Sequence, residues 1–253
     1  MTQRKIALIT GGSRGLGRNA ALQLADKGID VIITYRAEKD KALEVVSEIK
    51  AKGQQALAIQ LDVADTASFD NFFNTLSEKL KEVWDTDKFN YLINNAGIDA
   101  ASLISQTSEE AFDSLFNVHF KGVYFLTQKA LPLLADSGRI INISTGLTRF
   151  TTLGYAAYAS MKGAIEVFTK YLAKEVGSRG ITANVVAPGI IETDFTRSAF
   201  ESHANLNEYM SAQTALGRVG QPEDIGGVIA FLCSEDARWV NAQRIEASGG
   251  MFL

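Results

Sequence analysis

Short apolar runs alternate along this chain with longer segments in which apolar residues recur every three or four positions. The runs are IALIT (6–10), VIITY (31–35), ALAIQL (56–61), YLINN (91–95), RIINIS (139–144), ITANVVA (181–187) and RIEAS (244–248). Runs that are apolar at successive positions are typical of strands buried on both faces, as in a parallel sheet covered by helices. The amphipathic segment DKALEVVSEIKAKG (40–53) ends in lysine and then glycine, which favours a helix C-terminus.

This alternation predicts an α/β fold: a doubly wound, mostly parallel seven-stranded sheet of the Rossmann type with helices on both faces. No linker or repeat interrupts the pattern, and only three prolines occur. We therefore expect residues 1–253 to form a single domain. In such a sheet, ligands bind in the crevice at the carboxyl ends of the strands.

Composition narrows the class of protein. The chain has 253 residues, of which 46% are hydrophobic and 21% charged, as in soluble globular proteins. Its net charge of −4 is spread over interspersed signs and offers no basic stripe to nucleic acid or to an anionic membrane. Cys233 is the only cysteine, which excludes an internal disulfide and fits a reducing compartment. The apolar run at the N-terminus is too short for a signal peptide or a membrane span. We expect a cytoplasmic protein.

The first apolar run leads directly into TGGSRGLG, Thr10 to Gly17. Its glycines leave no Cβ where the chain turns and where the backbone has to approach a pyrophosphate, and the N–H groups of a helix from about Leu16 would point at that anion. A plain tight turn is the alternative, but the position between a strand and a helix favours a dinucleotide loop. The predicted loop contacts are Gly11, Ser13, Arg14, Gly15, Leu16 and Gly17.

The spacing Thr-Gly-x-x-x-Gly-x-Gly resembles the compact branch of the short-chain dehydrogenase/reductases. The same family is matched, in the same order, by Asn94-Asn95-Ala96-Gly97, by Tyr158 with Lys162, by Pro188-Gly189 and by the tail 217–250. The resemblance covers nearly the whole chain. It implies an NAD(P)-dependent oxidoreductase that acts on the CH–OH group of donors and binds its cofactor in the one Rossmann domain.

The end of the second predicted strand bears on the choice of cofactor. An NAD site usually carries an acid there for the ribose hydroxyls, whereas this strand ends in Tyr35 and Arg36, with no carboxylate before Glu38. Arg14 and Arg36 could clamp a 2′-phosphate by charge-assisted hydrogen bonds of about 1.5–3 kcal/mol each. The alternative is that both arginines are solvated surface charges. We predict NADP(H) rather than NAD.

Two tyrosines, Tyr155 and Tyr158, compete for the role of proton donor. The segment AAYASMKGAIEVFTKYLAKEV has helical period, so residues four apart share a face, and only Tyr158 has a cation, Lys162, one turn on. Tyr35 and Lys39 have the same spacing but lie across a strand end. Lowering the pKa of a phenol from about 10 to about 7 requires roughly 4 kcal/mol. One positive charge about 4 Å away, at an effective dielectric of about 20, supplies about that much. The prediction is that Lys162 lowers the pKa of Tyr158.

The resemblance implies further catalytic residues. The family places a serine 13 residues before the tyrosine, where this chain has Thr145 with Ser144 beside it. We favour Thr145 for holding the substrate oxygen, because Ser144 would face the other way on a strand. Asn117 matches the asparagine that kinks its helix and holds a water, with a locally bonded helix asparagine as the alternative. His119 is interpreted as a packing or surface residue, and no Cys/His cluster has metal-ligand spacing, so no metal is expected.

The remaining cofactor contacts also rest on the resemblance. It implies that Asp62 and Val63 hold the adenine, although Asp62 could instead be a helix N-cap. It implies that Asn95, Ala96 and Gly97 steady the sheet beside the cofactor, although asparagines at a strand end are also turn formers. Lys162 would bind the nicotinamide ribose. The carboxamide would be bound by the element Pro188, Gly189, Ile191 and Thr193, with Ile190 on the ring or simply at a hydrophobic strand exit.

These expectations combine into an NADP(H)-dependent enzyme that transfers a hydride between nicotinamide and a small-molecule carbonyl or secondary alcohol. A substrate lid is expected at about 193–217. The alternatives are a dedicated 3-oxoacyl-[acyl-carrier-protein] reductase of fatty-acid synthesis and a non-enzymatic NADP(H)-sensing protein. Family resemblance and surplus apolar residues on the helices at about 107–134 and 153–177 predict a homotetramer or homodimer.

Overall fold

A computed structural model of the chain describes residues 4–202 and 205–253. It confirms the predicted fold class. One sheet of seven strands runs in the order β3-β2-β1-β4-β5-β6-β7, and every neighbouring pair is parallel. The strands are β1 (Ile6–Ile9), β2 (Asp30–Tyr35), β3 (Ala56–Gln60), β4 (Phe89–Asn94), β5 (Leu134–Ile143), β6 (Thr182–Pro188) and β7 (Arg244–Ala247).

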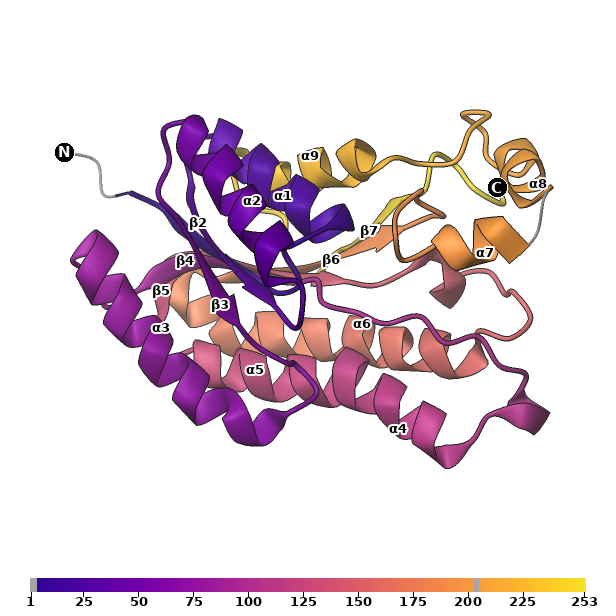
Figure 1. Cartoon of the computed structure of the whole chain (residues 1–253), viewed down its shortest axis with the longest axis horizontal. Helices are drawn as coiled ribbons and strands as arrows, with labels where there is room; N and C mark the ends of the chain where they lie inside the picture. Colours follow the sequence, from indigo (N-terminus) through magenta and orange to yellow (C-terminus); the bar gives the residue numbers. More distant parts are fainter. Residues whose placement is uncertain (1–3, 203–204) are drawn as a thin grey trace.

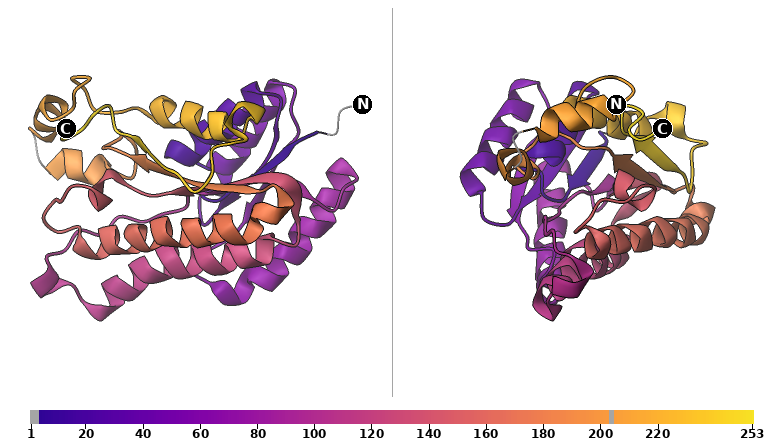
Figure 2. Two further views of the ribbon diagram at one scale, coloured as in Figure 1. Left: turned by 180° about the vertical axis from the view of Figure 1, so that it is seen from behind. Right: turned by 90° about the vertical axis from the view of Figure 1, so that its right-hand side faces the viewer.

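Helices cover both faces of this sheet, as Figures 1 and 2 show. On one face lie α1 (Gly15–Asp26), α2 (Lys39–Ala51) and α9 (Pro222–Leu232); on the other lie α3 (Phe69–Trp84), α5 (Gly122–Ala130) and α6 (Ala156–Val176), with α4 (Glu109–Phe116) before α5. Two hydrophobic clusters, one on each face, share the strands between them. This sharing explains why β1, β2 and β6 are buried along their whole length and apolar at successive positions.

Local sequence sets the helix limits. The predicted stop at Lys52-Gly53 is confirmed: α2 ends at Ala51, and Gly53 has a φ of +88°, a conformation that glycine adopts readily. The helix α9 begins with Pro222 at its first turn and a capping box between Gln221 and Asp224. The helix α6 runs uninterrupted over 21 residues because no glycine within it has a positive φ and no proline occurs.

The predicted helix over about 107–134 is interrupted. A π-helical segment, Asn117–Lys121, separates α4 from α5, and the N–H of Gly122 bonds the carbonyl of Asn117 five residues back. A Cβ on Gly122 would lie 2.1 Å from the carbonyl oxygen of Val63, so α5 can approach the loop after β3 only with glycine there. Such single wide turns are frequent at functional sites. The strand β5 also begins at Leu134, earlier than the predicted run at 139.

The carboxyl ends of β1, β2, β4, β5 and β6 meet at one edge of the sheet. Beyond that edge lie α7 (Arg197–Ser202) and α8 (Leu206–Ala212), which Figure 1 shows at the right-hand end of the molecule, away from the N-terminus. Within residues 4–202 and 205–253, no helix is both long and apolar enough to cross a membrane.

Candidate active site

A cavity of about 640 Å³ opens at the carboxyl edge of the sheet. It is lined by nearly all of the residues that the sequence predicted for a dinucleotide and for catalysis. These are Gly11, Ser13, Arg14, Gly15, Leu16, Tyr35, Arg36, Asp62, Val63, Asn95, Ala96, Gly97, Ser144, Thr145, Tyr158, Lys162, Pro188, Gly189, Ile190, Ile191 and Thr193. Two predicted residues, Gly17 and Asn117, do not line it.

The glycine loop has the shape of an anion cradle. Gly11 and Gly15 have φ values of +66° and +54°, which other residues rarely adopt. Gly17 has a different role from the predicted cofactor contact: a Cβ there would lie 2.3 Å from the carbonyl oxygen of Gly11. It therefore allows the first turn of α1 to pack behind the loop. The start of α1 at Gly15 agrees with the expected start near Leu16.

The asparagine pair after β4 fixes this loop. The side-chain amide of Asn95 donates to the carbonyls of Thr10 (2.9 Å) and Gly11 (3.1 Å), and the backbone N–H groups of Asn95 and Ala96 donate to the Thr10 hydroxyl, both at 3.0 Å. Asn94 is buried and donates to Asn142 (2.8 Å) and to Thr127 (3.0 Å). These bonds tie β1, β4 and β5 together at the cavity edge, beyond what a turn requires.

The rim at β2 and β3 carries the residues predicted for the adenosine half. Tyr35 is buried, whereas Arg36 is exposed and Arg14 lies 3.8 Å from the carboxylate of Asp194. The alternative that Asp62 is a helix N-cap is wrong, since Asp65 caps the next helix. The carboxylate of Asp62 instead accepts from the N–H of Ala64 (2.9 Å), and Asp62 lines the cavity.

Tyr158 and Lys162 lie on the inner face of α6 and are both buried. The ammonium of Lys162 donates to the carbonyl of Ile143 (2.8 Å) and lies 5.8 Å from the centre of the Tyr158 ring. Burial lowers the pKa of Lys162 to about 7. Burial and, after it, the nearby Asp99 carboxylate raise the pKa of Tyr158, while a hydrogen bond with the Thr145 side chain lowers it.

The expectation that Lys162 brings the pKa of Tyr158 down to neutrality is therefore wrong for this chain's own groups. Desolvation of the phenol raises its pKa, and burial also disfavours the charge of the lysine that was expected to lower it. A raised pKa keeps the proton on the phenol at neutral pH. That state suits a group that donates a proton rather than one that takes it.

Thr145 and Ser144 point in different directions. Thr145 has extended backbone angles (φ −159°, ψ 155°), and its hydroxyl accepts from the N–H of Leu147 (3.3 Å) and contacts Tyr158. The Ser144 hydroxyl donates to Glu166 (2.7 Å) on the side of α6. Successive residues of extended chain face opposite ways, so Thr145 is the hydroxyl next to the phenol.

The wide turn before α5 positions Asn117 and His119, and of the two interpretations of His119 it favours the packing residue. Asn117 is half-buried and opens the π-helical segment, so its position does bend the helix. His119 is not a surface residue: its ring is buried, packs edge-on against Tyr158 at 5.1 Å and lines the cavity. Its Nε2 lies 2.8 Å from the carbonyl oxygen of Ile98 and 3.3 Å from the backbone nitrogen of the same residue, while burial first and Lys162 second lower its pKa to about 3.

Asp99, directly after the Asn-Asn-Ala-Gly element, is a site residue that the sequence reasoning missed. It lines the cavity, burial raises its pKa, and its Oδ1 is buried without a hydrogen-bond partner among the described residues. After burial, which is the larger cause, its charge raises the pKa of Tyr155 as well as that of Tyr158. An acidic residue following that element was the available signal.

The segment after β6 closes the other side of the cavity. Thr193, Asp194, Phe195, Thr196, Ala199, Leu206 and Met210 line it from the stretch that includes α7 and α8. Within residues 4–202 and 205–253, no group of three or more His, Cys, Asp or Glu side chains is arranged to hold a metal ion. The cavity therefore combines a glycine cradle with a buried phenol, hydroxyl and amine.

Comparison with known proteins agrees with this geometry. Residues 11–252 match the family model described as enoyl-(acyl carrier protein) reductase. The chain is 40% identical to the 3-oxoacyl-[acyl-carrier-protein] reductase FabG of Staphylococcus aureus over 100% of both proteins. It is 37% identical to the solved angucycline C-6 ketoreductase LanV with bound NADP, at a TM-score of 0.93 over 98% of this chain and 95% of that one. LugOII, a reductase for keto-reduction at C1 during lugdunomycin biosynthesis, is 34% identical, with a TM-score of 0.93 and full coverage of both chains.

The fold and the cavity define a dinucleotide-binding oxidoreductase. The chain belongs to the short-chain dehydrogenase/reductase family. It is an oxidoreductase that acts on a CH–OH or carbonyl group. This assignment removes the alternative of a non-enzymatic sensor.

Proposed function

We propose that the protein is an NADP(H)-dependent carbonyl reductase that interconverts a ketone and a secondary alcohol. The observation that carries this proposal is that Thr145 and Tyr158 line the same cavity, with the Lys162 ammonium 5.8 Å from the centre of the Tyr158 ring. Two hydroxyls side by side can both bond one carbonyl oxygen, and the acidic one can protonate it.

Each side chain then has one task. Bound NADPH would supply the hydride. Tyr158 Oη gives its proton to the carbonyl oxygen, which becomes the hydroxyl of the alcohol product. The Thr145 hydroxyl orients that oxygen and, by its bond to Tyr158, favours the phenolate that remains. The Lys162 ammonium, held by the Ile143 carbonyl, lies close enough to stabilise that phenolate.

Replacing Tyr158 by phenylalanine tests this assignment. We expect kcat to fall by about 10²–10⁴-fold, the usual contribution of a general acid, while the dissociation constant of NADPH stays within about twofold. Tyr155→Phe is the matched control, since Tyr155 also lines the cavity but has no lysine one turn on. Retained turnover in the Tyr158 variant would show that another group donates the proton.

The cavity also supports the choice of NADP(H). Gly11 and Gly15 form a cradle free of Cβ atoms, Arg36 lines the cavity directly after β2, and Arg14 lines it from the glycine loop. Removing Arg36 should lower kcat/KM for NADPH by about 10–100-fold, equivalent to one charge-assisted bond, and leave kcat/KM for NADH nearly unchanged. Arg18, which is paired with Glu48 (2.7 Å) and does not line the cavity, is the charge-matched control. Equal losses with both cofactors would reject the clamp.

The substrate end of the cavity favours a bulky apolar ketone. Its walls are mainly apolar or aromatic, with Leu147, Phe150, Leu153, Tyr155, Phe195, Leu206, Met210 and Met251 among the lining residues. The likeness to LanV and LugOII supports this class. The identity to FabG supports a second candidate, a 3-oxoacyl-[acyl-carrier-protein] reductase.

A substrate panel with NADPH separates the two. It should contain a polycyclic aromatic ketone, a 3-oxoacyl thioester and an enoyl thioester, the last to test C=C reduction. We expect the highest kcat/KM for the polycyclic ketone and no turnover of the enoyl thioester. A higher kcat/KM for the 3-oxoacyl thioester, especially when it is carried on acyl carrier protein, would favour the second candidate.

Two further proposals concern assembly and closure. Phe112, Tyr124, Phe125, Val167 and Tyr171 expose apolar surface on α4, α5 and α6, which supports a homodimer or homotetramer through these helices. Light scattering should give a molecular mass that is a multiple of 27.4 kDa, and Tyr171→Glu should reduce that mass.

We also propose that residues at about 193–217 act as a lid over the cavity. Binding of NADP(H) should then slow trypsin cleavage at the exposed Arg197. Unchanged cleavage would argue against closure.

A further inference from the structure

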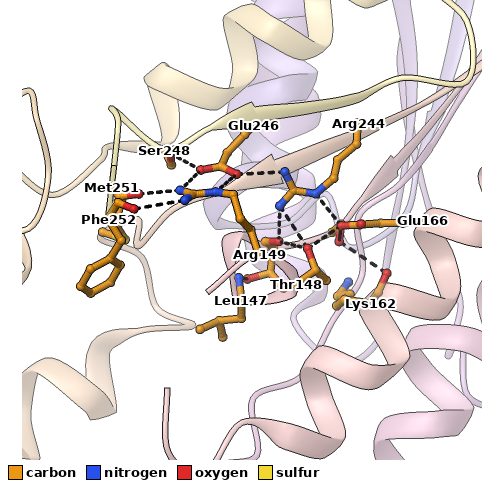
Figure 3. Close-up of polar contacts among 12 residues, drawn as sticks. Leu147, Thr148, Arg149, Lys162, Glu166, Arg244, Glu246, Ser248, Met251 and Phe252 are labelled. Atoms are coloured by element: carbon orange, nitrogen blue, oxygen red, sulfur yellow. Dashed lines mark hydrogen bonds and ion pairs between the residues drawn. The ribbon is translucent and has the colours of Figure 1, made fainter. Parts of the chain in front are cut away.

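A network of four alternating charges surrounds the loop that carries Thr145, and Figure 3 shows it. Glu166 lies on α6 two turns beyond Tyr158 and one beyond Lys162, on the same helix face. Its Oε1 accepts from Ser144 Oγ (2.7 Å), Thr148 Oγ1 (2.7 Å) and Arg244 Nε (2.8 Å). Its side chain is 17% exposed, so this carboxylate is held within the protein rather than solvated.

Arg244, from the edge strand β7, reaches the same loop. Its Nη2 donates to the backbone carbonyl of Thr145 (3.1 Å) and to the Thr148 hydroxyl (3.0 Å), and its Nη1 donates to Glu246 (2.9 Å). Because β6 separates β7 from β5 in the sheet, no backbone ladder joins β7 to this loop. The guanidinium supplies that connection.

Arg149 extends the network to the last residues of the chain. It makes a two-pronged contact with Glu246, at 2.8 and 2.6 Å, and donates to the carbonyls of Met251 (2.6 Å) and Phe252 (3.1 Å). Arg149 and then Arg244 and Ser248, by their hydrogen bonds, hold the pKa of Glu246 down at about 2. Glu246 thus remains ionised at neutral pH. The formal charges of the two arginines and the two carboxylates in the network sum to zero.

We propose that Glu166 and Arg244 are positioning residues for the active-site hydroxyl. Arg244 fixes the main chain of Thr145 so that its hydroxyl lies against Tyr158, and Glu166 binds the Ser144 hydroxyl so that Thr145 alone is offered to the substrate oxygen. The network also couples this loop to the segment of Met251, which lines the substrate end of the cavity. This inference rests on the proposed carbonyl reduction, since neither Glu166 nor Arg244 lines the cavity itself.

The kinetic test compares Arg244→Met and Glu166→Gln with Arg179→Met. Arg179 is a matched control at the opposite end of the sheet, where it bonds one carboxylate, that of Asp136 (2.8 Å), and the backbone carbonyl of Leu131 (2.9 Å). Because a displacement of about 1 Å can cost about 10²-fold in rate, we expect kcat to fall by about 10–100-fold in both network variants. The dissociation constant of NADPH should stay within about twofold, and the Arg179 variant should keep its kcat.

Combining Arg244→Met with Thr145→Ala distinguishes a positioning role from a general loss of structure, because the effects of the two substitutions on kcat should then not be additive. In a Thr145→Ala background, Arg244→Met should cost less than about threefold, because the hydroxyl that it positions is already gone. An equal loss in both backgrounds, an unchanged kcat in the network variants, or a loss of NADPH binding would each overturn the proposal. Arg244→Lys, which keeps the charge but cannot bond both Glu166 and the Thr145 carbonyl with one planar group, should behave as a weaker Arg244→Met.

Hydrogen exchange gives a readout that does not depend on the reaction. The backbone amides of Leu147, Arg149 and Phe150 should exchange at least about tenfold faster in Arg244→Met than in wild type, whereas the α1 amides should not change. If the wild-type enzyme reduced no carbonyl in the panel, the proposed function would fail while this measurement still tested the network. Unchanged exchange in the loop would overturn the positioning role.

Discussion

Replacing Lys162 by methionine should stabilise the folded protein at neutral pH and at the same time stop turnover. Lys162 is 4% exposed, and burial lowers its pKa from 10.5 to about 7. At about 1.36 kcal/mol per pKa unit, keeping this amine in the fold costs roughly 4 kcal/mol at pH 7. The methionine leaves the Ile143 carbonyl without this donor, which costs about 1–3 kcal/mol. The variant should be more stable by about 2 kcal/mol, or about 4–8 °C in Tm.

The lowered pKa of Lys162 also predicts how the stability difference between the two proteins changes with pH. The unfolded lysine keeps its proton up to its ordinary pKa of 10.5, whereas the folded one loses it near 7. Between these values the unfolded state binds more protons, so the stability of the wild-type protein rises with pH, while below pH 7 the penalty is full and constant. At pH 10 the penalty is only about 1 kcal/mol, and the lost bond to Ile143 should cancel or reverse the advantage of the variant.

Urea denaturation of both proteins at pH 7, 8.5 and 10 measures this difference, and groups common to both proteins cancel from it. Lys88→Met is the control, because Lys88 also donates to a backbone carbonyl, that of Pro132 (2.6 Å), but in an exposed bond. A Lys162 variant that is less stable than wild type at pH 7, or whose difference from wild type does not change with pH, would refute the reasoning.

Two other predictions concern the loop and the buried histidine. Gly17→Ala should weaken NADPH binding by at least about tenfold, as measured by fluorescence titration, because the added Cβ would lie 2.3 Å from the Gly11 carbonyl oxygen. Gly163→Ala is the control: a Cβ there would meet nothing within 4 Å, so denaturation should show a gain in stability of about 0.5–1 kcal/mol. His119 has a folded pKa of about 3 against an ordinary 6.5, so the unfolded state binds the extra proton between these values and stability falls as pH drops through this window. Between pH 7 and 5 this costs wild type about 2 kcal/mol, a loss that His119→Gln should lack when unfolding is measured at both pH values.

The sequence predicted the sheet and most of the cavity because the determining features are local. Runs apolar at successive positions mark strands covered on both faces, and the positions that follow those strands must converge at one edge. The face shared by Tyr158 and Lys162 follows from helical geometry alone. The opposite orientation of Ser144 and Thr145 likewise follows from extended backbone.

The features that could not be predicted depend on how deeply side chains are buried and on contacts between residues far apart in the sequence. Spacing placed a lysine near Tyr158 but could not show that desolvation would dominate the pKa of both groups. The burial of His119 depends on a wide helical turn, which a 3.6-residue period does not anticipate. Arg244 and Glu166 are 78 residues apart in sequence, and only the pairing of β6 with β7 brings them together.

The wide turn at Asn117–Lys121 also sets the angular phase between α4 and α5. One residue more than an ordinary turn rotates everything that follows by about 100° about the helix axis. If the same residues formed an uninterrupted α-helix, Gly122 would turn away from the Val63 carbonyl, and a side chain would enter the space that glycine leaves open. The extra residue therefore keeps Gly122 opposite the Val63 carbonyl, and a variant that made this turn regular without shortening the chain should lose that close approach.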